Sequence, residues 1–330
     1  MDHVVIYISL IVAVAPMLAM LFFIWWLDRY DREPLRYVFG AYLWGGFGAV
    51  FLSMVGTEIG IRAFGEVINN SGYDFTSVVL APLVEEFMKG LVVFFLLRYR
   101  QFDNVTDGLV YGAASGLGFG MMENFLYFTL LAGPSPGYEW LNMLFVRSVM
   151  TANMHCAASA TFGAGISMLR DKGTRGISRV IIFYAMAVVL HGTWNYLVTS
   201  TVAAYWGLAI ILLFTYIVII FIIFVLGIRR ERKARESILL EEFDLGVLPV
   251  AYKKILMSYG AMRKSDWFPE YLNKTKYLSL VSRLALRKSA YFKVDEERKS
   301  RVKEEIVEIR KELVRYSELI EEFPADKGAG

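Results

Sequence analysis

The sequence is poor in cysteine, and its first two thirds are poor in charge. Its single cysteine, Cys156, excludes an intrachain disulfide and a cysteine-rich metal site. Residues 1–228 hold only 12 of the 35 Lys and Arg residues and 14 of the 32 Asp and Glu residues. The formal charge is therefore −2 for residues 1–228 and +5 for residues 229–330. Because this positive surplus is small and mixed with acids, we expect no nucleic-acid partner.

Long hydrophobic runs account for the missing charge. The chain is 56% hydrophobic with a mean hydropathy of +0.45, whereas soluble domains are about 45–50% apolar. A run of about 18 or more apolar residues can cross a bilayer as a helix. The sequence therefore predicts an all-α polytopic membrane protein with about seven transmembrane helices, the first of them a retained span. The predicted spans are 4–27, 36–62, 76–98, 108–132, 141–169, 178–200 and 205–228.

The distribution of Lys and Arg between the loops predicts the orientation in the membrane. Cytoplasmic loops are enriched in these residues, and here every second loop carries them, while 65–74, 133–139 and 201–204 contain none. We therefore expect a multi-pass protein of the cell membrane with the N-terminus outside and the C-terminal tail in the cytoplasm. The basic loop residues are Arg29, Arg32, Arg36, Arg98, Arg100, Arg170, Lys172, Arg175 and Arg179.

Residues 229–330 are predicted to form a charged, helical cytoplasmic extension after the membrane domain of residues 1–228. Apolar residues recur there at alternating spacings of four and three, which is typical of an amphipathic helix. We expect this helix to pack on other helices of the tail, at 238–243 or 277–286, and no partner is predicted for the tail. The recurring residues are Val302, Ile306, Ile309, Leu313, Tyr316 and Ile320.

Ionisable or amide side chains lie well inside four of the predicted spans, the third to the sixth, and such groups are costly inside a membrane. The cost is roughly 2.5–3.5 kcal/mol for one charge at the centre of a helix. With a rise of about 1.5 Å per residue, the acids and histidines reach similar depths, which predicts one shared site in the outer half of the bilayer. Arg147, by contrast, is expected to reach the interface. The candidate site residues are Glu85, Glu86, Lys89, Glu123, Asn124, His155, His191 and Asn195.

These residue types suggest acid–base chemistry. Glu85 and Glu86 are adjacent and share Lys89 as their cation, so the two carboxylates should differ in proton affinity and one can act as a general base. His191 and Asn195 lie four residues apart on one helix face and can donate hydrogen bonds to an oxyanion. A stripe of small residues predicts close helix packing beside Glu123. The stripe consists of Gly108, Gly112, Gly116 and Gly120.

In order and spacing, a set of motifs over residues 28–200 resembles the PrsW family of intramembrane proteases, which is distantly similar to the CAAX-prenyl endopeptidases. The motifs are DRYDREPLR, Glu85-Glu86-x-x-Lys89, Glu123-Asn124, His155 and His191-x-x-x-Asn195. The resemblance implies that Glu85 and Glu86 are catalytic, that Glu123, His155 and His191 complete the site, and that substrates are membrane-anchored proteins such as anti-sigma factors. The CAAX-type signature has Arg four residues after its second Glu, where this chain has Lys89 three residues after Glu86.

Two chemistries fit the residues of this site. In the first, Glu85 or Glu86 deprotonates a water that attacks a peptide carbonyl. In the second, His155, His191 and a Glu bind zinc. We favour the first, without a cofactor, because the sequence has no HExxH motif and Lys89 balances charge in the Glu pair without a metal.

Functions other than proteolysis also fit parts of this pattern. The same buried acids and histidines also describe a proton- or solute-coupled transporter, although no inverted repeat is evident. A seven-helix receptor and a scaffold that acts through its tail are weaker alternatives.

Overall fold

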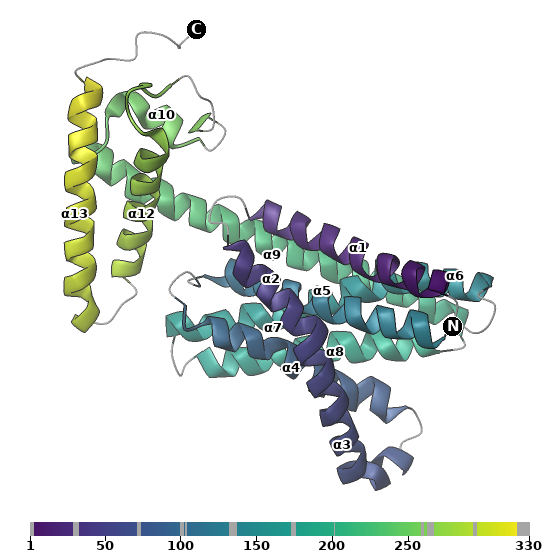
Figure 1. The fold of residues 1–330 in the computed structure, drawn as a ribbon. Coiled ribbons are helices and arrows are strands. Elements are labelled where there is room, and N and C mark those ends of the chain that lie inside the picture. Colours follow the sequence, from purple (N-terminus) through teal and green to yellow (C-terminus); the bar gives the residue numbers. More distant parts are fainter. Residues whose placement is uncertain are drawn as a thin grey trace. The chain divides into compact units, whose positions relative to one another are not determined.

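The computed structural model describes residues 3–28, 33–70, 74–99, 102, 104–131, 137–172, 176–200, 202–258, 261–262, 267–292 and 296–321. Over these ranges the chain is helical and contains no β-strand (Figure 1), which confirms the all-α prediction. Part of the DRYDREPLR motif lies outside the described residues, as do four of the arginines used to predict the orientation: Arg29, Arg32, Arg100 and Arg175.

The chain forms two compact units, Met1–Gly227 and Ile228–Gly330. In the first unit the elements are α1 (His3–Leu27), α2 (Leu35–Leu43), η1 (Trp44–Ala49), α3 (Val50–Asn70), η2 (Thr76–Leu80), α4 (Ala81–Leu96), α5 (Val105–Leu130), α6 (Tyr138–Val146), η3 (Arg147–Thr151), α7 (Ala152–Lys172) and α8 (Ile177–Thr199). Helix α9 (Ala203–Asp244) begins in the first unit and ends in the second, which also contains η5 (Val250–Tyr252), α10 (Lys253–Leu256), α12 (Lys274–Tyr291) and α13 (Glu296–Glu321). Three of the η segments, η1, η2 and η3, are short π-helices.

Helices occupy each of the seven predicted spans. In the described ranges, four helical segments have the length and composition to cross a membrane: His3–Leu27, Leu35–Gly65, Ile177–Thr199 and Ala204–Asp244. The other three predicted spans carry the acids of α4 and α5 and His155 of α7, so their composition is more polar. The total of seven crossings remains a prediction.

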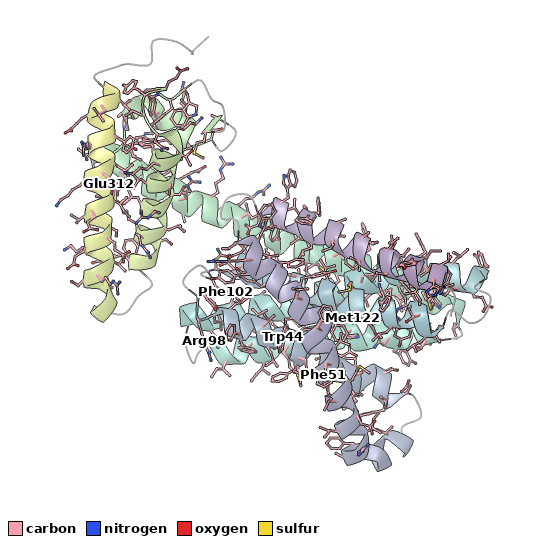
Figure 2. All side chains as sticks on the ribbon, in the orientation of Figure 1. Trp44, Phe51, Arg98, Phe102, Met122 and Glu312 are labelled. Carbon is pink, nitrogen blue, oxygen red and sulfur yellow. The ribbon has the colours of Figure 1, made fainter. Side chains whose placement is uncertain are left out.

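Large apolar side chains on the outside of the first unit mark it as a membrane protein. Phe51 on α3 and Ile211 and Phe214 on α9 each expose more than 60% of their surface, and Figure 2 shows Phe51 among the side chains of α3. So many exposed large apolar side chains are rare on soluble monomers, because they have to be shielded from water. On a membrane-spanning helix they face lipid.

Helix α5 lies at the centre of the first unit, and glycines allow its backbone to approach its neighbours. Every residue from Thr106 to Met121 is buried. A Cβ on Gly116 would overlap the carbonyl oxygen of His155 on α7, and one on Gly118 would overlap the carbonyl oxygen of Tyr42 on α2. The glycine stripe therefore has the predicted packing role, and it fixes the backbone from which His155 projects.

We expect Gly116→Ala to destabilise the membrane unit, because the added methyl group has no room beside the His155 backbone. Overpacking of this kind costs about 1–3 kcal/mol. The matched control is Gly40→Ala in α2, where a Cβ has no heavy atom within 4 Å. Thermal unfolding of both variants in detergent checks the prediction, and equal midpoints would contradict it.

The second unit has its own hydrophobic core. Leu239 and Phe243 at the end of α9 pack with residues of α12 and with the buried stripe of α13. All the recurring apolar residues predicted for the last helix lie in this core or against it, which confirms the prediction that the helix packs on the tail's own elements. Tyr277 and Tyr316 form one of several aromatic contacts there, with ring centroids 5.6 Å apart.

A buried carboxylate lies in this second unit. Glu242 has no exposed surface, and it accepts hydrogen bonds from Lys288 Nζ at 2.7 Å and from Arg310 Nη2 at 2.6 Å. Burial raises the pKa of the Glu242 carboxyl, but the hydrogen bonds from Arg310 and Lys288 lower it by more, so that it lies below its ordinary value. Such a group stabilises the fold at pH values above its unfolded-state pKa of about 4.3.

Glu242→Gln should therefore lower the free energy of unfolding of the second unit by about 3 kcal/mol at pH 7, because Lys288 and Arg310 lose their buried partner. The difference from the wild type should shrink as the pH falls from about 4 through the lowered pKa of Glu242, where the folded wild type also loses the charge. Hydrogen exchange along α12 and α13 measures the effect. Glu236→Gln, at a surface pair with Arg232, is the control and should change protection little. Similar protection in the two variants at pH 7 would contradict the prediction.

Candidate active site

Four helices, α4, α5, α7 and α8, bring most of the predicted site residues into one buried network. Its centre is Glu86 on α4, which has no exposed surface. Glu86 Oε1 accepts from Lys89 Nζ at 2.5 Å and from His191 Nδ1 at 2.8 Å, and Oε2 accepts from Ser159 Oγ at 3.0 Å. Glu86 is thus neutralised by a cation and hydrogen-bonded through both oxygens. The ion pair of Lys89 in the described chain is with Glu86, and not with Glu85 at the i, i+4 position.

The partners of His155 identify its tautomer. Its Nδ1 lies 3.1 Å from Lys89 Nζ, and its Nε2 lies 2.8 Å from Glu123 Oε2. An ammonium group only donates hydrogen bonds, so Nδ1 accepts. The ring proton is then on Nε2 and is donated to Glu123. His155 is a neutral link between the cation on α4 and the carboxylate on α5.

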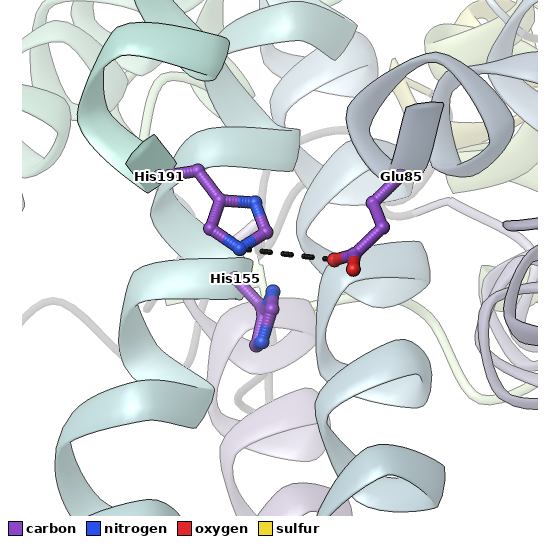
Figure 3. Close-up of side chains that lie close together, drawn as sticks. All are labelled: Glu85, His155 and His191. Carbon is purple, nitrogen blue, oxygen red and sulfur yellow. Dashed lines mark ion pairs between the residues drawn. The ribbon is translucent and has the colours of Figure 1, made fainter. Parts of the chain in front are cut away.

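His191 and Glu85 face each other with one unpartnered atom each. Because His191 Nδ1 donates to Glu86, its Nε2 carries a lone pair. This Nε2 lies 3.7 Å from Glu85 Oε2 (Figure 3), too far for a direct hydrogen bond. Glu85 Oε2 is buried and has no hydrogen-bond partner among the described residues. Two facing acceptors repel each other unless a proton, a water molecule or a cation lies between them.

The charges of the network distinguish the carboxylates from one another. Lys89 neutralises Glu86, and Arg147 Nη2 lies 2.8 Å from Glu123 Oε2. Within the described part of the chain this leaves Glu85 as the carboxylate of the network with no cation in direct contact. Glu85 is therefore the group best placed to accept a proton or to bind a metal.

Arg147 and Ser159 contact the network although the sequence did not suggest a site role for either. The side chain of Arg147 is only 15% exposed and turns inward to Glu123, and its expected reach to the interface stays a prediction. The sequence feature that could have identified Arg147 is a charged residue within the predicted span 141–169, eight residues before His155. Ser159 lies four residues after His155 and therefore on the same helix face.

Asn124 and Asn195 occupy the edges of the arrangement. Asn124 is fully buried and exchanges hydrogen bonds with Arg147, which donates from Nε to Asn124 Oδ1 at 3.2 Å. Asn195 Nδ2 donates to the carbonyl oxygen of Ser77 at 2.8 Å and so joins α8 to η2, the π-helix before α4. In the described chain Asn195 makes no hydrogen bond to another network residue. π-Helical turns occur often at functional sites, and here η2 precedes the Glu pair while η3 begins at Arg147.

Among the described residues, Glu85, His155 and His191 form a group that can hold a metal ion. One donor atom from each lies within 4.8 Å of the others, and two His with one Glu is a known catalytic zinc set. His191 fits this role well, since Glu86 accepts from its Nδ1 and so orients its ring, as carboxylates behind the histidine ligands of zinc sites do. His155 fits less well, because both its ring nitrogens have partners and one of these contacts would have to break.

The fold and the site together define a polytopic membrane protein with a buried acid–histidine centre on four helices. Residues 33–227 match a family described as "PrsW family intramembrane metalloprotease". The chain therefore belongs to the PrsW family of intramembrane proteases, which confirms the resemblance seen in the motifs.

Curated relatives support this assignment. The chain is 30% identical over 213 residues to the "Protease PrsW" of Clostridioides difficile, covering 64% of this chain and 85% of the relative. It is 31% identical over 191 residues to that of Geobacillus kaustophilus, covering 57% and 78%, and 24% identical over 229 residues to that of Bacillus subtilis, covering 67% and 93%. No solved structure matches the chain. Family membership favours proteolysis over the transporter, receptor and scaffold alternatives.

Proposed function

We propose that this protease hydrolyses peptide bonds of membrane-anchored proteins with Glu85 as the general base that activates water. The observation that carries the proposal is the unpartnered, buried Glu85 Oε2 beside the lone pair of His191 Nε2. Glu86 is unsuited to the role, because Lys89, His191 and Ser159 occupy its oxygens. Glu86 is instead a positioning residue that orients the ring of His191.

In this mechanism a water molecule between Glu85 and His191 gives a proton to Glu85, and its oxygen attacks the peptide carbonyl carbon. The proton then moves to the leaving nitrogen as the C–N bond breaks. His191 Nε2 can take up this proton and give it back, because Nε2 carries no proton of its own while Nδ1 donates to Glu86. In this neutral form His191 has no proton on Nε2 to donate to an oxyanion. The oxyanion-donor role that the sequence suggests for His191 is therefore not available in this form. Asn195 also remains a candidate oxyanion donor.

A zinc-dependent mechanism is the second candidate, favoured by the 4.8 Å grouping of Glu85, His155 and His191. The description of the matching family as metalloproteases points the same way. When bound, zinc would activate water by lowering its pKa to about 7. Glu86 would then orient His191 as a ligand and Lys89 would still neutralise Glu86. Glu85 contacts the reacting water as base in the first candidate and would hold the metal in the second.

The proposed topology follows from the loop charges. Residues 1–228 form the protease domain in the cell membrane with the N-terminus outside, and residues 229–330 form a cytoplasmic tail. The site then opens toward the outer half of the bilayer, where it can reach an extracytoplasmic segment next to a substrate's anchor. The family resemblance supports regulatory substrates such as anti-sigma factors.

Glu85→Gln should abolish proteolysis, because the amide cannot take a proton from water. The measurement compares new protein N-termini in membranes that contain the native protein or the variant at matched levels. We expect N-termini next to transmembrane segments with the native protein only. Glu86→Gln should slow their formation but not remove them, and Glu58→Gln, at an exposed pair with Arg62, is the control. Identical sets of N-termini from the native protein and Glu85→Gln would overturn the proposal.

Metal analysis separates the two candidate mechanisms. For Glu85 acting without a metal, we expect purified protein stripped with a chelator to retain its full cleavage rate and to hold less than one equivalent of zinc. Stoichiometric zinc that is lost together with activity, and whose return restores activity, would instead establish the zinc mechanism. Zinc retention in His191→Ala provides the control for binding outside the site.

A further inference from the structure

The Arg147 side chain is fixed on several sides at the edge of the network. Its Nε donates to Asn124 Oδ1 at 3.2 Å, and its own carbonyl oxygen accepts from Asn124 Nδ2 at 3.3 Å. The guanidinium carbon lies 3.7 Å from the centre of the Tyr127 ring, a cation–π contact. A long, flexible side chain is thus held in one orientation by α5, before any substrate arrives.

One nitrogen of this guanidinium has no properly oriented hydrogen-bond acceptor. Nη2 lies 2.8 Å from Glu123 Oε2 as an ion pair, yet it is buried and makes no hydrogen bond to any described residue. Among the described residues, Glu85 Oε2 is thus a buried acceptor without a partner, and Arg147 Nη2 is a buried donor whose close partner is the ion-paired Glu123. Nη2 carries two N–H groups, so a donor remains beside its contact with Glu123. Peptide hydrolysis needs these two functions, an acceptor for the proton of water and a donor for the carbonyl oxygen.

The other donors of the network already have partners. Lys89 Nζ contacts Glu86 and His155, and His155 Nε2 donates to Glu123. Asn195 Nδ2 donates to Ser77, so its use would require a rearrangement of η2 or α8. Arg147 is therefore the pre-positioned donor of the network.

Exposure indicates the side from which a substrate reaches the network. The side chains of Glu85, Arg147 and Glu123 are 15%, 15% and 23% exposed, whereas those of Glu86 and Lys89 are 0% exposed. The three more exposed groups are the reactive carboxylate, the Arg147 donor and the carboxylate that joins Arg147 to His155. A peptide that approaches these more exposed side chains meets Glu85 and Arg147 before Glu86 and Lys89.

We propose that Arg147 binds the carbonyl oxygen of the scissile peptide bond and stabilises the oxyanion formed when water attacks. This inference rests on the proposed function of Glu85 as the base. As water attacks, the carbonyl π electrons move to oxygen, and Arg147 Nη2 donates a hydrogen bond to the resulting negative charge. When the C–N bond breaks, the carbonyl re-forms and the oxygen leaves Arg147.

The test measures the rate at which Glu85-dependent N-termini appear in isolated membranes for native protein, Arg147→Gln, Glu123→Gln and the double variant. Loss of an oxyanion donor lowers the rate by about 10²–10³-fold. If Arg147 acted only by holding Glu123, the double variant would be no slower than Glu123→Gln. We expect it to be at least tenfold slower, and free guanidinium to restore part of the rate in Arg147→Ala.

Two controls separate loss of the Arg147 contact from loss of folding or of any arginine. Arg62→Gln removes an exposed arginine paired with Glu58 and should leave the rate unchanged, and thermal unfolding in detergent confirms that the Arg147 variants fold. A native rate in Arg147→Gln, or a double variant that equals Glu123→Gln, overturns the role of Arg147 and leaves Glu85 intact. Failure to detect any Glu85-dependent N-termini overturns the proposed function and this inference with it.

Discussion

The need to neutralise charge inside a membrane governs the arrangement of this protein. A carboxylate in low dielectric is tolerated only beside a cation and with its oxygens hydrogen-bonded. Glu86 meets both conditions through Lys89, His191 and Ser159, and Glu123 is paired with Arg147. Glu85 meets neither condition among the described residues, and this difference from Glu86 and Glu123 is the basis on which we propose it as the reactive group. The other contacts of the site keep Glu85 unpaired beside the neutralised Glu86 and Glu123.

Backbone packing provides the rigidity that such a site requires. Helix α5 approaches α7 so closely that Gly116 lies against the His155 carbonyl, and its other face lies against α2 in the same way. Ser115 Oγ donates to the carbonyl oxygen of Lys89 and ties α5 to α4 as well. Side chains that project from backbones in direct contact have little freedom to drift, so distances near 3 Å between different helices can persist.

Most of the helices and of the candidate site residues were predictable from the sequence. The contacts that were not predictable have physical reasons. Apolar runs predict the helices, and the cost of buried charge singles out Glu85, Glu123, His155 and His191. Sequence spacing places Lys89 beside either glutamate, and only the rotamer reveals that it pairs with Glu86. Contacts between helices far apart in the chain, such as Arg147 with Glu123 and Asn195 with Ser77, depend on helix rotation and on the π-helical turns, which hydrophobicity does not encode.

The continuity of α9 limits where the chain can be divided into fragments that are expressed separately. Composition divides the chain near residue 228, yet the helix continues to Asp244, and Leu239, Glu242 and Phe243 near its end belong to the core and the ion-pair network of the second unit. A fragment that starts after these residues would lack one side of its core. Expression of a soluble tail therefore requires a start point within the basic segment that follows the apolar part of α9.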